Sequence, residues 1–153
     1  MTARAFLVAV FLCASLSVQA QTKSKIIPDD WLPALAPSIK TSLDSLREAN
    51  AQMEMNRLSR EVADMTDAQL FIAYVRLYEK LTPKEREKLL AEQTAWLKKR
   101  PAVAKKGVES EGGSLAPLEA NNAELTYTEK RLAELRARYK AAGTKKKTAD
   151  EDE

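Results

Sequence analysis

The side chains available for catalysis in this chain are unusually restricted. Its 153 residues include no histidine and a single cysteine, Cys13. A histidine general base, a Ser-His triad and the common histidine-containing zinc sites are therefore excluded. Carboxylates are abundant, but on helices with alternating charge they usually form a solvated face rather than an acid/base pair. We expect a binding protein, not an enzyme, with no cofactor and no metal ion.

Four side chains are the candidates for contact with a protein partner: Trp31, Gln93, Trp96 and Arg100. Tryptophan is favoured in binding hot spots, so Trp31 could be an exposed hook, although docking of its own segment onto the domain is the stronger reading. Trp96 lies on an amphipathic helix, where a tryptophan usually packs in the core. Arg100 could instead be the ion-pair partner of a helix carboxylate.

Three of these residues lie on the helix whose limits are the clearest in the sequence. Thr82 can cap a helix, Pro83 suits its first position, and Glu85 can complete a capping box. The apolar side then continues through Leu89, Leu90, Trp96 and Leu97. Pro101 is predicted to interrupt this helix, and residues 102–115 are expected to be weakly helical at best, with a turn at Gly112 and Gly113.

Further helices are predicted on both sides. Apolar residues recur at helical spacing from Ser38, with a break near Asn50, and Thr66 with Gln69 predicts a new capping box and a second helix. Only Leu81 and Thr82 separate that helix from the next, so the two are expected to form an antiparallel hairpin. Ser114 is predicted to cap the last helix. Its heptad seam consists of Leu118, Leu125, Leu132 and Tyr139, with Thr128 and Leu135 between them.

These patterns predict an all-α fold, a helical hairpin bundle of three to four helices over residues 38–140. Residues 1–20 have the charge and apolar run of a secretory signal, so the mature chain is expected to begin at Gln21 and to be periplasmic or secreted. Residues 21–37 contain three prolines and are expected to be an extended arm. Residues 141–153 are lysine-rich and then acidic, which predicts a disordered tail. The net charge of +3 does not favour nucleic acid binding, and no stretch is apolar enough for stable membrane insertion.

The chain resembles the LprI-like lysozyme-inhibitor family of small exported helical proteins. That family combines a Gln-x-x-Met-Asn element, an Asp-x-x-Leu element followed by Tyr, a Leu-x-x-x-Gln-x-x-Trp segment closed by Arg, and a Gly-Gly-Ser turn before a helix with Thr-x-x-Arg-x-x-x-Leu. The matching residues are Gln52, Met55, Asn56, Asp67, Leu70, Tyr74, Leu89, Gln93, Trp96, Arg100, Gly112, Gly113, Ser114, Thr128, Arg131 and Leu135.

The resemblance implies an exported protein whose partner is another protein, such as a lysozyme. This chain departs from the family pattern in being a cysteine-less variant: family cysteine positions hold Leu58, Ala104 and Ala123. It also has Phe71 where the family commonly has Asn. The implied function is inhibition of a lysozyme-like peptidoglycan hydrolase by occupation of its cleft. The alternative is a periplasmic adaptor or structural interaction module without inhibitory activity.

Overall fold

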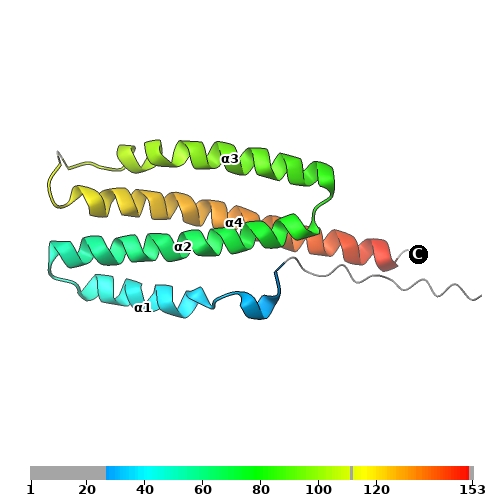
Figure 1. Ribbon diagram of the computed structural model, residues 1–153, viewed down its shortest axis with the longest axis horizontal. Helices are drawn as coiled ribbons and strands as arrows, with labels where there is room; N and C mark the ends of the chain where they lie inside the picture. Colours follow the sequence, from blue (N-terminus) through cyan, green and yellow to red (C-terminus); the bar gives the residue numbers. More distant parts are fainter. Residues whose placement is uncertain (1–26, 111, 152–153) are drawn as a thin grey trace, which may run out of the picture.

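A computed structural model describes residues 27–110 and 112–151 of the chain (Figure 1). It comprises a short 3-10 helix, η1, and four α-helices; no strand occurs in this part of the chain. Their bounds are Asp29–Trp31 for η1, Leu35–Glu48 for α1, Gln52–Lys80 for α2, Pro83–Lys106 for α3 and Ala116–Glu151 for α4. The all-α prediction is confirmed. The signal peptide predicted at 1–20 lies outside the described residues.

The helices form two antiparallel hairpins, α1 with α2 and α3 with α4 (Figure 1). The hairpins meet through α2 and α4, which run parallel to each other along the centre of the molecule and share its most extensive interface. α1 and α3 therefore lie at opposite edges. The predicted turn at Leu81 and Thr82 is confirmed, and α3 runs antiparallel to α2 (Figure 1). The closest backbone packing of α3 is on α4 and not on α2 as predicted.

The predicted start of α3 is confirmed in detail. The Thr82 hydroxyl accepts a hydrogen bond from the Glu85 backbone N–H, and the Glu85 carboxylate accepts one from the Thr82 N–H at 2.9 Å. The predicted interruption at Pro101 is wrong, since α3 continues to Lys106. Pro101 lacks the N–H that would bond to the Leu97 carbonyl, but Leu97 is half exposed at the edge of the bundle, where water can bond that carbonyl.

α2 also differs from the prediction. The break near Asn50 is confirmed by extended backbone at Ala49 and Ala51, but no helix starts at Thr66. The Thr66 hydroxyl is buried inside a continuous α2 and donates to the Val62 carbonyl at 2.8 Å. A threonine can satisfy its hydroxyl within a helix in this way, so a capping-box pattern alone does not fix a helix start.

The core lies between α2, α3 and α4. Each contributes a pair of buried side chains: Leu70 and Leu77 from α2, Leu89 and Trp96 from α3, and Leu132 and Leu135 from α4. The predicted seam of α4 is confirmed, because Thr128, Leu132 and Leu135 are buried and Leu118, Leu125 and Tyr139 are half-buried. Burial of these apolar surfaces supplies the main stabilisation of the bundle.

The ends of the domain depart from the expected bounds. η1 and the start of α1 at Leu35 fall within the arm expected to be extended to residue 37. α4 begins at Ala116, so Ser114 is not its cap, and Gly112 and Gly113 form the predicted turn with positive φ angles of 102° and 86°. The backbone of α4 is helical to Glu151, beyond the bound of residue 140 expected for the domain. The alanines and lysines beyond residue 140 are good helix formers, and no proline ends the helix.

Leu135→Ala tests the central position of α4. Leu135 is fully buried, so its truncation should lower the free energy of unfolding by about 2–5 kcal/mol through lost transfer energy and a cavity. The matched control Leu90→Ala, at a side chain that is 56% exposed, should change it by less than about 0.5 kcal/mol. Urea denaturation followed by circular dichroism measures both, and equal losses would contradict the assigned core.

Candidate functional site

Arg100 lies where α2, α3 and α4 meet. Its guanidinium forms ion pairs with Asp67 of α2 and Glu124 of α4, and all three side chains are largely buried. Asp67 also accepts a hydrogen bond from the Thr128 hydroxyl at 3.2 Å, while Glu124 forms a second ion pair with Arg60 at 3.2 Å. An arginine fork between two carboxylates links three helices with fixed geometry. The alternative reading of Arg100, as the partner of a helix carboxylate, is therefore confirmed.

Trp96 lies one turn before Arg100 and is buried in the core. Its ring stacks on Tyr127 of α4 with centroids 4.9 Å apart and planes 4° from parallel. The Arg100 guanidinium also approaches the Trp96 ring, at 5.8 Å from its centroid. Stacking and the cation contact fix the position of α3 along α4. The core-anchor reading of Trp96 is confirmed, and its ring is not on the surface.

Gln93 faces the same interface one turn earlier. Its side-chain oxygen accepts a hydrogen bond from the buried Arg131 guanidinium at 3.0 Å. Arg131 also pairs with Glu134 at 3.0 Å, and another of its nitrogens lies 3.8 Å from the Glu92 carboxylate. The structure thus brings Gln93, Trp96 and Arg100 together on one face of α3, as their spacing predicts, but this face points into the bundle.

Three further family-motif residues, Gln52, Asn56 and Ser114, contribute to holding the turn between α3 and α4. Asn56 of α2 donates to the Ser114 carbonyl at 2.8 Å and receives a hydrogen bond from Gln52 at 2.9 Å. On the other side, the Glu119 carboxylate accepts from the Ser110 hydroxyl at 2.7 Å and the Ser110 N–H at 3.0 Å, which lowers the pKa of Glu119. These contacts tie the turn to α2 and α4, so they position backbone rather than form a site.

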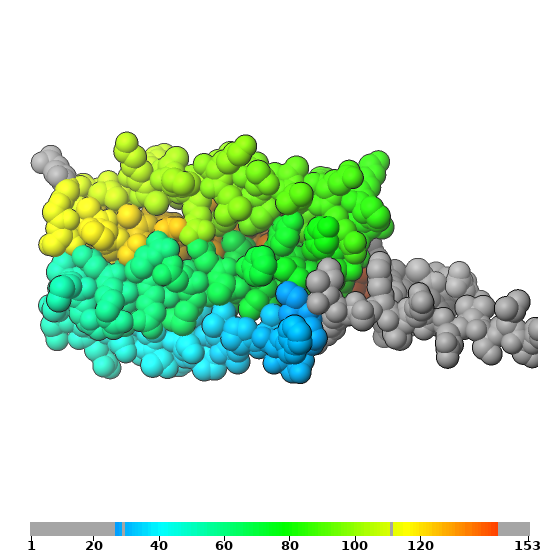
Figure 2. Space-filling view, viewed as in Figure 1, coloured from blue at the N-terminus to red at the C-terminus, as the bar shows by residue number. Residues whose placement is uncertain are grey.

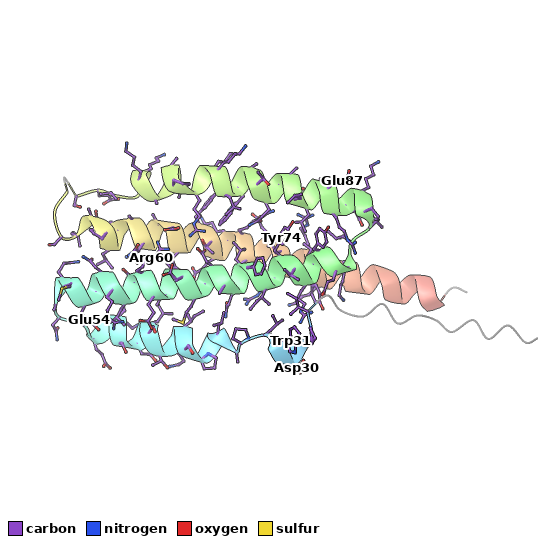
Figure 3. The ribbon with its side chains drawn as sticks, viewed as in Figure 1. Asp30, Trp31, Glu54, Arg60, Tyr74 and Glu87 are labelled. Atoms are coloured by element: carbon purple, nitrogen blue, oxygen red, sulfur yellow. The ribbon has the colours of Figure 1, made fainter. Side chains whose placement is uncertain are left out.

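Trp31 has a different environment from the other three candidates. It is 74% exposed, so the expectation that it docks the arm is wrong (Figure 3). The arm is anchored by Ile27 instead, whose carbonyl accepts from Arg76 at 2.6 Å and whose N–H donates to Glu79 at 3.2 Å. These two hydrogen bonds join the backbone of Ile27 to the side chains of Arg76 and Glu79, so the arm is held without an aromatic side chain. Trp31 is therefore directed away from the domain.

Phe71 is a surface residue that the sequence patterns did not single out as a site. It is 62% exposed on α2, and with Ile27 and Leu32 of the arm it lines a small apolar pocket of about 20 Å³ that also includes Ile72 and Val75. Leu32 and Phe71 line this pocket and the exposed Trp31 directly precedes Leu32 in the chain; we call these three residues the aromatic patch. The replacement of the family's Asn by Phe71 was the one sequence signal that could have located it.

Two features are absent from the residues that the structure describes, 27–110 and 112–151. Among them, no three or more His, Cys, Asp or Glu side chains are grouped as a metal ion would need. None of the helices in this part of the chain is long and apolar enough to cross a bilayer.

Arg100→Met tests the ion-pair cluster. The substitution leaves Asp67 and Glu124 facing each other with only Arg60, the second partner of Glu124, as a nearby cation, so it should destabilise the protein by about 3 kcal/mol. Arg57→Met removes an arginine with two exposed carboxylate partners and should cost much less. Adding Asp67→Asn and Glu124→Gln to Arg100→Met should restore part of the loss in urea denaturation. A triple variant no more stable than Arg100→Met would contradict this account.

Glu92 provides a pH-dependent contact between α3 and α4. Partial burial opposes its ionisation, but the hydrogen bond from Arg138 at 2.5 Å and the charge of Arg131 prevail and lower its pKa from the ordinary 4.5. A lowered folded-state pKa means that the stabilisation is present above the unfolded pKa and is lost as pH falls through the folded pKa. Wild type should exceed Glu92→Gln by about 0.5 kcal/mol at neutral pH, because solvent screens the pair. The difference should vanish in acid unfolding titrations, and a constant difference would argue against it.

Comparison with known protein families agrees with this geometry. The family described as Lysozyme inhibitor LprI matches residues 44–135, from the last turn of α1 to Leu135 of α4. No curated protein and no solved structure matches the chain. The matched region contains the ion pairs of Arg100 with Asp67 and Glu124, the Trp96–Tyr127 stack and the turn between α3 and α4. The chain therefore belongs to the LprI lysozyme inhibitor family.

Proposed function

We propose that this protein is an exported binding protein that inhibits a lysozyme-like peptidoglycan hydrolase by covering its cleft. The family supplies the class of partner. The proposal rests on one observation, the exposure of Trp31 on an anchored arm. Gln93, Trp96 and Arg100, in contrast, form contacts between helices. The contact with the hydrolase is therefore assigned to the aromatic patch, and the family-motif residues act as its scaffold.

Anchoring makes Trp31 suited to tight binding. The arm is held to α2 at Ile27 by hydrogen bonds and at Leu32 by the small apolar pocket, on both sides of Trp31 in the chain. A large side chain that is already held in position loses little conformational freedom on binding, which raises affinity. Tryptophan offers a wide apolar surface and one N–H donor, the combination most enriched among interface hot spots.

The chemistry of a lysozyme-like cleft matches that combination. Sugar-binding clefts present apolar and aromatic walls with a few polar groups, and glycoside hydrolases place two carboxylates across the scissile bond. The Trp31 ring would pack against a cleft wall on which a sugar ring otherwise packs. Its indole N–H would donate a hydrogen bond to an oxygen atom of the enzyme in the cleft. Phe71 beside the arm would widen the contact.

Charge is consistent with this orientation. Many lysozymes are basic, and complementary charge speeds association with such a protein. Asp30 precedes Trp31 and is exposed next to it (Figure 3). The lysines of α3 lie at the opposite edge of the bundle from Trp31, so they do not oppose the approach of a basic enzyme to the arm.

The inhibition assay is a cell-wall clearing reaction with a C-type lysozyme and the mature chain from Gln21. Wild-type protein should slow clearing at micromolar concentration, and Trp31→Ala should weaken inhibition about 30-fold, the loss typical of a hot spot. Leu90→Ala is the matched control, since it truncates an exposed apolar side chain on α3 and should inhibit as wild type. Circular dichroism melting should not change for either variant, because both side chains are exposed.

Absence of inhibition by folded wild-type protein would overturn the proposed function. Inhibition that Trp31→Ala and Phe71→Ala both leave unchanged would retain the inhibitor and reject the aromatic patch as its contact surface.

A further inference from the structure

Positive charge is concentrated on α3. This helix contains eight lysines and arginines against three glutamates, whereas α2 contains four cationic and five acidic residues. The arginines and one glutamate of α3 face inward: Arg86 donates to the Tyr78 carbonyl, Arg100 lies in the ion-pair cluster, and Glu92 pairs with Arg138. The charge left on the exposed side of α3 is that of its six lysines and of Glu85 and Glu87.

All six lysines of α3 are exposed. Lys88 lies near the Glu92 carboxylate, whose pKa its charge helps to lower, which leaves five that do not act on that carboxylate. Lys84 is in the first turn, and Lys98, Lys99, Lys105 and Lys106 occupy the second half, where the helix carries no carboxylate. Among the side chains that the structure describes, none of the five is engaged with a carboxylate. Glu85 and Glu87, the remaining acidic residues, both lie in the first half of the helix.

Apolar side chains accompany the lysines on the same exposed helix. Leu90 and Leu97 are 56% and 49% exposed, and their seven-residue spacing places them on one side of α3. Pro101, four residues on, is also exposed on that side. We call these three residues and the five lysines the cationic ridge. α3 forms one edge of the molecule, so the ridge is open to a large flat partner (Figure 2).

The identity of the cations indicates the kind of partner. The ion pairs between helices described above use arginine, as in the pairs of Arg60, Arg100 and Arg138. Arginine is enriched and lysine depleted in protein–protein interfaces, because the arginine fork forms directed pairs whereas lysine is a hydrated point charge. A lysine surface with exposed leucines is instead typical of helices that lie at an anionic bilayer surface, where the lysines meet headgroups and the leucines enter the interface.

We propose that the cationic ridge binds the surface of a membrane containing anionic phospholipids. α3 is about 36 Å long at 1.5 Å per residue, enough to contact many headgroups along its length. Attachment is peripheral, because no described helix can span a bilayer. Trp31 lies at the other edge of the bundle, so attachment leaves the aromatic patch open. The proposal stands independently of the hydrolase partner.

Vesicle co-sedimentation of the mature chain tests the ridge. Protein should sediment with vesicles made of equal parts phosphatidylcholine and phosphatidylglycerol, not with pure phosphatidylcholine, and binding should fall as salt increases. Lys98→Glu with Lys99→Glu should lower partition about tenfold or more, because two attractive charges become repulsive. Leu90→Ser with Leu97→Ser should lower it less and leave the remaining binding more sensitive to salt.

The matched control is Lys130→Glu with Arg136→Glu, which makes the same charge change at exposed positions of α4. It should retain most of the binding, and circular dichroism should show that all variants are folded. Equal losses in the two charge-reversal variants would overturn the ridge as the binding surface, as would wild-type binding that is the same with neutral vesicles or absent with anionic ones.

Discussion

The largely buried guanidinium of Arg100 is the constraint on which the helix arrangement depends. A charge at this depth is tolerated only with well-placed partners, and those partners are Asp67 and Glu124 on two other helices. An arginine fork binds carboxylates in only a narrow range of geometries. It therefore fixes the position of α3 along the axis of α4 and the distance of both helices from α2. The Trp96–Tyr127 stack and the hydrogen bond between Gln93 and Arg131 repeat this link on the neighbouring turns.

Gln93, Trp96 and Arg100 point into the bundle, so the residues that hold the helices together differ from the exposed residues proposed to bind partners. A family motif rich in Gln, Trp and Arg suggests a binding surface when it is read as residue types alone, yet each of the three is satisfied within the bundle. The exposed features are different residues at different places: the aromatic patch beside α2 and the cationic ridge along α3. Such a division is physically reasonable, because polar groups locked in a cluster cannot be released to a partner without leaving buried charge unpaired.

The two edges of the bundle also differ in the chemistry they offer. At one edge the arm presents an aromatic ring with a carboxylate nearby, on backbone fixed by Arg76 and Glu79. At the other, α3 presents exposed lysines and half-exposed leucines on a helix with only Leu89 and Trp96 buried. An exposed aromatic side chain on fixed backbone is suited to binding in a protein cleft, whereas diffuse positive charge is suited to binding an extended anionic surface.

Local chemistry in the sequence determined much of this fold. The Thr82 capping box, the break near Asn50, the positive-φ glycines and the α4 seam depend on short-range geometry and on helical period, so they could be predicted directly. The lack of histidine likewise restricts the chemistry open to the chain, whatever its fold. Gln93, Trp96 and Arg100 could be placed on one helix face by spacing alone.

Tertiary structure decided which way that face points and which helices it meets. Thr66 satisfies its hydroxyl within α2, and α3 continues past Pro101 because it lies at a hydrated edge; neither environment is visible in local sequence. The position of α3 against both α2 and α4 depends on carboxylates elsewhere in the chain, Asp67 of α2 and Glu124 of α4. The exposure of Trp31 depends on the hydrogen bonds between the backbone of Ile27 and the side chains of Arg76 and Glu79, about 50 residues later in the chain. Helical periodicity does not predict such a long-range contact.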